Sequence, residues 1–526
     1  MPTGSGKKFF ITTAIDYANS TPHLGTAYEK IGADVIARYR RLRGDDVYFL
    51  MGNDEHSLNV EKRARELGKD PQAYCDEMAE RFEATWRRLE ISYDRFIRTT
   101  DEVHKNAVRK FLQAIYDNGK GDIYKGHYEG WYCVSCEAFY QEKDLAGGNC
   151  PTHGTKPEWI REQNWFFKLS KFQDQLIEYI TKKNPGFIQP EMRRNEILNV
   201  IRGGLQDVSI SRAGVKWGIP LPFDDWSVAY VWVDALINYI TGAGYGTDEE
   251  RFRKTWPADV HVIGKDITRF HCIIWPALLW SAGLEPPLKV HAHGFVNLQG
   301  AKMSKTLGTV LDPVEVAEKV GVDALRYFLM AEVPFDRDGD FTWERVQDRC
   351  NADLANGIGN LLARTTAMIV RYQVGIVRKT PTVREASESF INNSHMGDAL
   401  EGYRRGMDEM LPSRALEQAW RIVAALDSFI AARKPFQIAK DPARADEVAD
   451  ILYVCAETLR ILAILIQPVM PGAAASIWSQ LGLPGSVDAQ RIDSDLDFFK
   501  FPEQGRVTKG DPLFPRLEIL PPVDAK

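Results

Sequence analysis

The chain has 526 residues, of which 44% are hydrophobic and 26% are charged. This length exceeds a single hydrophobic core, so three or four domains are expected, and the composition is typical of a water-soluble globular protein. A net charge of −6 neither indicates nor excludes nucleic-acid binding, because local basic patches suffice for it. Without an apolar run of membrane-spanning length or a signal-peptide core, a cytoplasmic protein with no membrane partner is expected.

The first predicted elements form a βαβ unit between residues 9 and 56. Residues 9–14 are apolar with threonines and favour a buried parallel strand, and residues 46–51 favour the next strand. A helix is expected from Leu24 to a stop at Gly44. Ligands of such sheets bind beyond the carboxyl ends of the strands, so the polar groups near His23 and Asp54 mark a candidate site.

Two short motifs indicate phosphate binding. The sequence HLGT at residues 23–26 opens the helix, where free amides and the helix dipole suit a phosphate, although alone it could be a helix cap with a chance histidine. Residues 300–308, GAKMSKTLG, place Lys302 and Lys305 in a loop that could clamp a polyphosphate. A lysine-rich loop alone is usually only solvated, but the two motifs in this order support each other.

Residues 120–200 interrupt the α/β pattern and contain paired cysteines. Cys133 and Cys136 form a CxxC pair, and after a spacer of thirteen residues Cys150 and His153 form a CxxH pair. Two such pairs can complete a tetrahedral site with no open position, which predicts one structural zinc ion. The alternative is a loop with unrelated cysteines, and the four scattered cysteines are expected to be reduced core residues.

The later part of the chain changes from α/β to helical. Residues 205–300 resume the sheet pattern with aromatic side chains, for which core packing is the simplest interpretation. From about residue 345 the apolar residues recur at helical spacing, which predicts an all-helical remainder.

Taken together, these segments resemble a class I aminoacyl-tRNA synthetase, and their neighbours are similar to the methionyl-tRNA synthetase family in its form with a Cys3His zinc knuckle. The resemblance runs from residue 10 to about residue 365 and is carried by AIDYANSTPHLG, GNDEH, the two cysteine pairs, DVSISR, YVWVDALINYI, HVIGKDITRFH, HGFVNLQGAKMSKT and NADLANGIGNLLAR. It departs from the family pattern at four positions: Thr26 for a second histidine, Ser57 for glycine, Leu236 for proline and Phe436 for tryptophan.

The resemblance implies an α/β fold with a Rossmann-like parallel-sheet catalytic domain, a zinc-knuckle insertion and an all-α anticodon-binding helix bundle. The implied limits are 1–115 and 201–300 for the two catalytic halves, 116–200 for the insertion, 301–345 for the KMSKT loop and linking segment, and 346–526 for the bundle. A monomer is expected, because the chain ends soon after the bundle.

The implied activity is ligation of L-methionine to tRNA(Met), including initiator tRNA, through a methionyl-adenylate, with Mg²⁺ accompanying ATP and one structural zinc ion. The implied catalytic residues are His23, Thr26, Lys302 and Lys305. The ATP site would add Gly25, Gly264, Asp266 and Ser304 to His23 and the two lysines. The methionine site would comprise Ile15, Tyr17, Asp54, Trp232, Ala235, Tyr239, Ile267 and His271. The anticodon would contact Asn360, Arg364 and Phe436.

Two alternatives remain. A sister enzyme for leucine or valine would normally carry a large editing insertion, and residues 116–200 are too short for one. A non-catalytic synthetase relative that only binds RNA or zinc would be expected to lose the lysine motif or Asp54, and both are present. Pyrophosphate exchange with single amino acids separates the three hypotheses.

Overall fold

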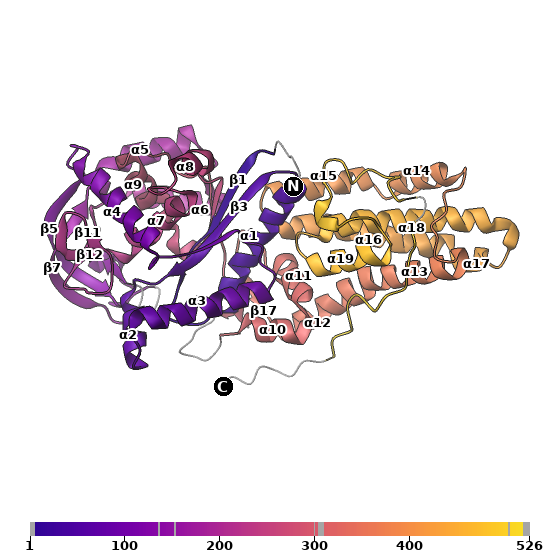
Figure 1. Ribbon diagram of the computed structural model, residues 1–526, viewed down its shortest axis with the longest axis horizontal. Helices are drawn as coiled ribbons and strands as arrows, with labels where there is room; N and C mark the ends of the chain where they lie inside the picture. Colours follow the sequence, from indigo (N-terminus) through magenta and orange to yellow (C-terminus); the bar gives the residue numbers. More distant parts are fainter. Residues whose placement is uncertain are drawn as a thin grey trace.

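The computed structural model describes residues 6–134, 137–151, 154–298, 300–302, 310–502 and 505–518, without the side chains at 138, 301 and 302. The molecule is elongated, with a sheet-containing half that includes the N-terminal elements and a helical half built from the later part of the chain (Figure 1). No helix in these ranges is both long and apolar enough to cross a membrane.

A seven-stranded parallel sheet forms the centre of the first half. The strand order is β2-β3-β1-β13-β14-β8, with β4 also paired to β3, and every pairing in it is parallel. The strands are β1 (Lys8–Thr13), β2 (Asp16–Tyr17), β3 (Asp46–Asp54), β4 (Arg95–Arg98), β8 (Ile188–Gln189), β13 (Val260–Gly264) and β14 (Val290–His293). Helix α1 (Leu24–Leu42) crosses from β1 to β3, which confirms the predicted βαβ unit.

Strand β3 is longer than the predicted 46–51 segment. It continues to Asp54 because Asn53 and Asp54 pair with Asp16 and Tyr17 of β2, a short strand that the sequence pattern did not indicate. Asp54 is therefore the last residue of a sheet strand, and its backbone position is fixed by the ladder.

Helices cover both faces of this sheet. One core cluster contains α1 and α3, and a second contains α4, α7 and α9. This two-sided burial explains why the strands are nearly continuous apolar runs. The covering helices are α2 (Leu58–Glu66), α3 (Pro71–Arg88), α4 (Glu102–Asp117), α7 (Val231–Ala243), α8 (Glu249–Thr255), α9 (Trp275–Ser281), the π-helical η5 (Phe270–Ile274) and the 3-10 turn η4 (Lys265–Ile267).

The interruption after residue 120 is mainly an antiparallel sheet of order β6-β5-β7-β9. Its strands are β5 (Ile123–Cys133), β6 (Ala138–Tyr140), β7 (Glu158–Phe167) and β9 (Val208–Ser209). A smaller sheet, β10-β12-β11, follows, with β10 (Ser211–Ala213), β11 (Pro220–Leu221) and β12 (Asp224–Ala229). The connecting elements are η1 (Glu142–Asp144), η2 (Leu169–Phe172), α5 (Gln173–Glu178), the π-helical η3 (Tyr179–Lys183) and α6 (Glu191–Arg202).

A third small sheet and two helices join the halves. Strands β15 (Val296–Leu298), β16 (Ala301–Lys302) and β17 (Gly339–Phe341) form the sheet, and α10 (Pro313–Val320) and α11 (Val322–Glu332) lie between β16 and β17 in the chain. The helical half contains α12 (Trp343–Arg349), the π-helical η6 (Cys350–Gly359), α13 (Asn360–Gln373), α14 (Val383–Asn393), α15 (Met396–Asp408), α16 (Pro412–Arg433), α17 (Pro435–Ile438), η7 (Pro442–Arg444), α18 (Ala445–Ile466), α19 (Pro471–Gln480) and η8 (Val487–Ala489).

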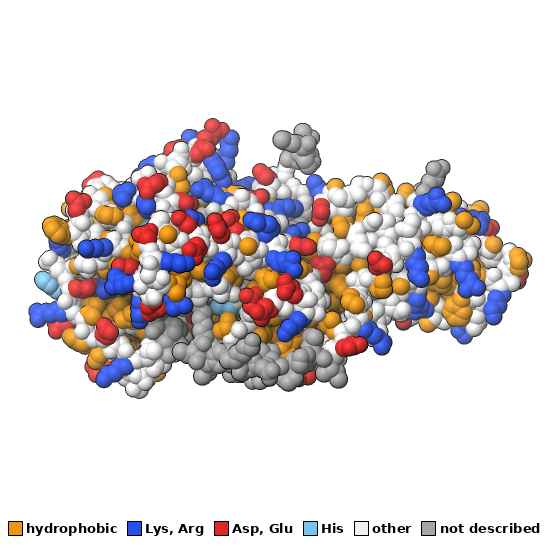
Figure 2. Space-filling model, turned by 60° about the horizontal axis from the view of Figure 1, so that its bottom comes forward, with side chains coloured by type: hydrophobic (Ala, Val, Ile, Leu, Met, Phe, Trp, Pro, Cys, Tyr) orange, Lys and Arg blue, Asp and Glu red, His pale blue; other side chains and the backbone are white. Residues whose placement is uncertain are grey.

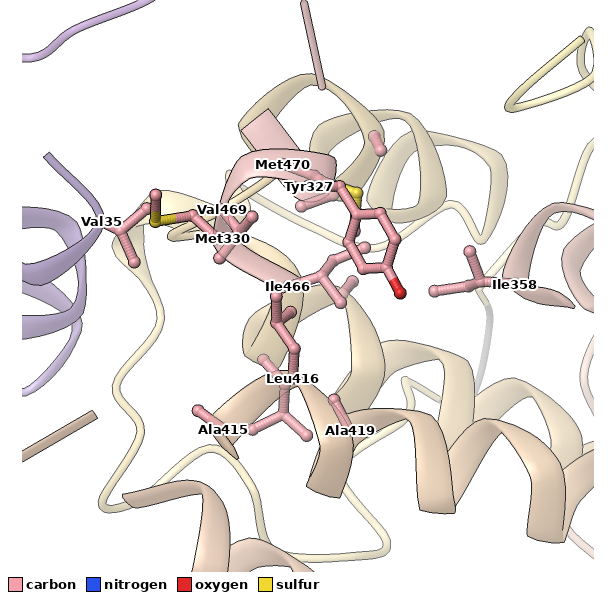
Figure 3. Close-up of a cluster of buried hydrophobic side chains, with 14 of the residues drawn as sticks. Val35, Tyr327, Met330, Ile358, Ala415, Leu416, Ala419, Ile466, Val469 and Met470 are labelled. Carbon is pink, nitrogen blue, oxygen red and sulfur yellow. The ribbon is translucent and has the colours of Figure 1, made fainter. Parts of the chain in front are cut away.

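A continuous apolar core links the halves. Figure 3 shows Val35 of α1 and Met330 of α11 close to Val469, which follows α18. Every residue of α18 from Val448 to Ile466 is buried, so this helix is the centre of the helical half.

On the face shown in Figure 2, basic and acidic side chains are interspersed over the sheet half, whereas Lys and Arg lie beside hydrophobic side chains at the helical end. The small negative net charge of the chain therefore does not describe every part of its surface.

Candidate functional site: a cleft at the carboxyl ends of the parallel strands

A cleft of about 480 Å³ opens where four parallel strands end. Its walls come from the segments after β1, β13 and β14, from the last residue of β3, and from α1 and α7. This is the edge at which parallel sheets bind ligands. Thirteen residues predicted for catalysis, ATP or methionine line it: Ile15, Tyr17, His23, Gly25, Thr26, Asp54, Trp232, Ala235, Tyr239, Gly264, Asp266, Ile267 and His271.

His23 is the N-cap of α1. Its Nδ1 atom accepts hydrogen bonds from the backbone N–H groups of Gly25 (3.1 Å) and Thr26 (3.2 Å), while Thr26 Oγ1 accepts one from His23 N (3.0 Å). The two bonds to Nδ1 place the ring proton of neutral His23 on Nε2. The cap and the phosphate-binding hypotheses are thus compatible, because capping leaves Nε2–H as a donor beside the cleft.

The Thr26 hydroxyl completes this cap. It also donates a hydrogen bond to the backbone oxygen of His23 at 2.8 Å. Its single proton is therefore directed at the protein backbone, where it holds the first turn of α1 in shape.

Aromatic rings form one side of the cleft. Trp232 stacks on Phe270 with ring centroids 4.0 Å apart, and Tyr17 meets the edge of Trp232 at 5.9 Å. These rings contact one another and also face the cleft, so the core-packing and pocket-lining interpretations of the sequence are both satisfied. Such a surface suits an apolar or thioether side chain.

Tyr239 and His271 form a hydrogen-bonded pair in the same wall. His271 Nδ1 donates to the Ile267 carbonyl (3.1 Å), so its Nε2 accepts a hydrogen bond from Tyr239 Oη (2.8 Å). Burial lowers the pKa of His271 to about 4, although the bond to Ile267 opposes this shift. His271 is therefore neutral near pH 7, and this wall carries no net charge from the pair.

Asp54 is a buried acid that forms no ion pair with any cationic group among the described residues. Burial, followed by the charges of Asp234, Glu137 and Glu55, raises the pKa of Asp54 well above its ordinary value. Among the described residues, its Oδ1 atom has no hydrogen-bond partner. The site therefore lacks one positive or hydrogen-donating group, which an ammonium ion would supply.

Gly264 and Asp266 end the β13 side of the cleft. A Cβ atom on Gly264 would lie 2.7 Å from Asp266 Oδ1, so a larger residue at this position would displace that carboxylate. The Asp266 carboxylate is held near the strand end, where it can accept hydrogen bonds from hydroxyl groups of a ligand.

A family model described as tRNA synthetases class I (M) matches residues 9–154 and 143–366. The chain belongs to the methionyl-tRNA synthetases of class I.

Relatives in this family match nearly the whole chain. It is 45% identical to the methionine–tRNA ligase of Caldanaerobacter subterraneus subsp. tengcongensis, covering 98% of this chain and 79% of that protein. It is 42% identical to the methionine–tRNA ligase of Thermotoga maritima, covering 97% of this chain and 80% of that protein. The Mycobacterium tuberculosis methionyl-tRNA synthetase in complex with methionyl-adenylate superposes with a TM-score of 0.92 at 41% identity, covering 97% of this chain and 100% of that one.

In this methionyl-tRNA synthetase, a network of charged side chains lies at the base of the cleft. The sequence analysis did not predict this network. Lys30 Nζ lies 3.0 Å from Asp16 Oδ2 and 2.8 Å from Glu29 Oε1, and Glu29 Oε2 lies 2.9 Å from His293 Nε2. Burial alone would lower the pKa of Lys30, but the two carboxylates raise it. The sequence signal was a charged pair in the middle of a helix whose other residues are largely apolar.

Other cleft-lining residues were not named as site residues, although three of them, Phe270, His293 and Phe295, lie inside the segments that carry the family resemblance. They include Phe82, Tyr140, Phe270, His293 and Phe295. Tyr140 comes from the insertion sheet, so the insertion contributes directly to the cleft wall.

The remaining predicted residues are not all described. Cys136, His153, Ser304 and Lys305 lie outside the described residues, and for Lys302 only the backbone pairing with Asn297 is given. Asn360, Arg364 and Phe436 lie in the helical half, away from the cleft, with α17 at its far end (Figure 1).

Proposed function

We propose that this chain ligates L-methionine to tRNA(Met), including initiator tRNA, in two steps. The methionine carboxylate attacks the α-phosphate of ATP, which forms methionyl-adenylate and releases pyrophosphate. The terminal ribose hydroxyl of tRNA then takes the methionyl group, and AMP leaves. The observation that carries this proposal is one cleft lined by a capped helix N-terminus, an aromatic wall and Asp54, whose Oδ1 atom has no hydrogen-bond partner among the described residues.

The first step depends on alignment and charge stabilisation, because the nucleophile is already ionised. In this proposal His23 Nε2–H donates to a phosphate oxygen, and Thr26 acts through the cap that it forms with His23. Asp266 and the close approach at Gly264 hold the ribose, and Gly25 admits the phosphates. Lys302, Ser304 and Lys305, with Mg²⁺, neutralise the pyrophosphate.

Methionine would lie against the aromatic side of the cleft. Asp54 pairs with its ammonium group, and this pairing supplies the missing partner of the buried carboxylate. The side chain would contact the neutral wall formed by Ile15, Tyr17, Trp232, Ala235, Tyr239, Ile267 and His271.

Exchange of labelled pyrophosphate into ATP tests this proposal directly. Methionine alone among methionine, leucine and valine should support exchange. Leucine- or valine-dependent exchange would assign the chain to a sister enzyme, and no exchange with any amino acid would indicate a binding module.

We also propose one structural zinc ion in the insertion. Cys133 and Cys150 are each only 1% exposed, and Cys133 Sγ lies 3.6 Å from Oγ1 of Thr155, whose carbonyl accepts the N–H of Cys150 at 2.8 Å. Both described thiols therefore flank one turn, an arrangement that fits a shared metal site completed by Cys136 and His153. The described residues contain no cluster of three or more potential metal ligands, and they include only two of the four proposed ligands.

Recognition of the anticodon is proposed for the helical half. Asn360 is exposed, Arg364 lies one turn later on α13, and Phe436 is 46% exposed, so all three can reach a ligand from solvent. Arg364 pairs with Asp427 at 2.6 Å, and RNA would compete with this surface pair. We further propose that the chain acts as a monomer in the cytoplasm, with the predicted domain limits.

A further inference from the structure

Glu137 is a buried carboxylate that is separate from the groups assigned to substrates. It lies in the turn between β5 and β6 of the insertion sheet and is 2% exposed. Its φ of +50° is a left-handed conformation that is uncommon for a residue with a side chain. Such conformations persist where surrounding contacts hold them, so the contacts of Glu137 indicate what this turn is built to hold.

The side chain of Glu137 holds the beginning of α2. Its Oε1 atom accepts hydrogen bonds from both the backbone N–H and the side-chain amide of Asn59, each at 2.9 Å. Hydrogen bonds from Ser57 and Leu58 also lower its pKa, against the larger effect of burial. Ser57 is the N-cap of α2 and follows Asp54 by only three residues, so this contact anchors the chain directly after Asp54.

The backbone of Glu137 holds the beginning of α7. Its carbonyl oxygen accepts a hydrogen bond from Tyr230 Oη at 2.5 Å, and Phe139, two residues later, packs against the Tyr230 ring at 5.4 Å. Tyr230 is the N-cap residue of α7, the helix that carries Trp232. One residue of the insertion is therefore bonded both to the start of α2, which closely follows Asp54, and to the start of α7, which carries Trp232.

We propose that Glu137 is a positioning residue for methionine binding, which sets the separation between the Asp54 wall and the Trp232 wall. The inference rests on the proposed assignment of methionine to that side of the cleft. The proposed ATP groups lie elsewhere, on the first turn of α1 and after β13. Loss of the contact should therefore weaken methionine binding much more than ATP binding.

The experiment compares Glu137→Ala, Glu137→Gln and Tyr230→Phe in the full-length protein by pyrophosphate exchange. Glu137→Ala should raise the KM for methionine roughly tenfold or more, the scale of one lost buried hydrogen bond to a charged group. The KM for ATP should stay within about threefold, because the α1 and β13 contacts are unchanged. Glu137→Gln keeps an acceptor for Asn59 and should rescue most of the methionine affinity, while Tyr230→Phe should give a smaller rise of the same kind.

Glu142→Ala is the matched control, because Glu142 is an exposed acid in the same insertion. It should leave both KM values unchanged. A methionine KM unaffected in all three variants, or methionine and ATP KM values that rise together, would overturn the positioning role. If Glu137→Ala does not fold, Glu137→Gln and Tyr230→Phe decide the question. Wild-type protein without methionine-dependent exchange would instead refute the proposed function.

Discussion

Three fully buried carboxylates show that neighbours, rather than burial alone, decide the charge of an acid. Burial raises the pKa of Asp234, but His56 and His104 on either side lower it to about 2. Asp34 also has a pKa of about 2, because Arg38 and Arg326 oppose the effect of its burial. Asp54 has acidic neighbours instead, and its pKa is raised. Of these three acids, Asp54 alone has no compensating positive neighbour, so a positively charged group of a ligand can stabilise its ionised form.

The first prediction concerns Asp54→Asn in the absence of methionine. An acid with a raised pKa in the folded state destabilises the fold at pH values above its unfolded pKa, progressively up to its folded pKa. The substitution should therefore raise the thermal unfolding midpoint, and the gain should be larger at pH 8 than at pH 5. Differential scanning calorimetry at the two pH values measures this, and a gain that is larger at pH 5 would contradict the pKa direction.

The same variant should bind methionine more weakly. Removing one partner of a buried ion pair typically costs about 2–5 kcal/mol, so the KM for methionine should rise at least about 30-fold. The KM for ATP provides the internal control. Stabilisation together with loss of substrate binding would mark Asp54 as a group held in place for function at a cost in stability.

At the scale of elements, the sequence predicts the framework of the cleft well. The strand at 9–14, the helix from Leu24 and the strand beginning at Asp46 are all present, because apolar periodicity and turn residues are local signals. The extension of β3 to Asp54 was not predictable, since it depends on pairing with β2. The same holds for the charge network around Lys30, because Asp16, the partner of Lys30, lies on β2, and His293, the partner of the neighbouring Glu29, lies on β14.

The residues of the candidate site were largely predictable, whereas their contacts were not. Short motifs located His23 and Asp54, and the family resemblance added Trp232 and His271; all four line the cleft. The hydrogen bonds that set the tautomer of His23 and the burial that keeps His271 neutral could not be predicted, because both depend on three-dimensional geometry. The assignments of Lys302 and Lys305 to pyrophosphate remain predictions.

The second prediction concerns the insertion element. Cys133→Ala and Cys150→Ala should each abolish the binding of one equivalent of zinc and increase proteolysis within residues 120–160, because a structural metal contributes directly to local folding. Metal analysis and limited proteolysis of the purified proteins measure both effects. Cys272→Ala is the control, since Cys272 is a buried cysteine of η5 and should not affect zinc content. Wild-type protein that contains no zinc and keeps its fold would contradict the metal assignment.

At the scale of the whole molecule, a buried ion pair links the two halves. Arg326 of α11 donates to Asp34 of α1 at 2.6 Å and to the carbonyl oxygens of Pro468 and Val469 at 3.1 and 2.8 Å. Val35, Tyr327 and Val469, which are neighbours in the sequence of Asp34, Arg326 and Pro468, belong to the apolar cluster in Figure 3. Packed side chains therefore connect the cleft to the helical end. The residues proposed to bind methionine and ATP nevertheless differ from those proposed to contact tRNA.

The last prediction uses this separation to test the anticodon assignment. Phe436 is exposed on α17 and offers a ring on which a splayed base can stack, and such stacking is typically worth about 1–3 kcal/mol per base. Phe436→Ala and Arg364→Ala should therefore lower kcat/KM for tRNA aminoacylation about 10- to 100-fold. Methionine-dependent pyrophosphate exchange needs no tRNA and should stay near wild type, since neither residue is near the cleft.

Arg405→Ala provides the control for this experiment, because Arg405 is an exposed arginine of α15 that forms a comparable surface pair with Glu401. It should change neither assay by more than about twofold, as expected for a solvent-exposed ion pair. Both assays must be run on the same purified preparations. If exchange and aminoacylation fall in parallel for Phe436→Ala, the substitution has damaged the fold or the connection through α11, and Phe436 does not recognise the anticodon. If only aminoacylation falls, the helical end reads the tRNA while the cleft activates methionine independently.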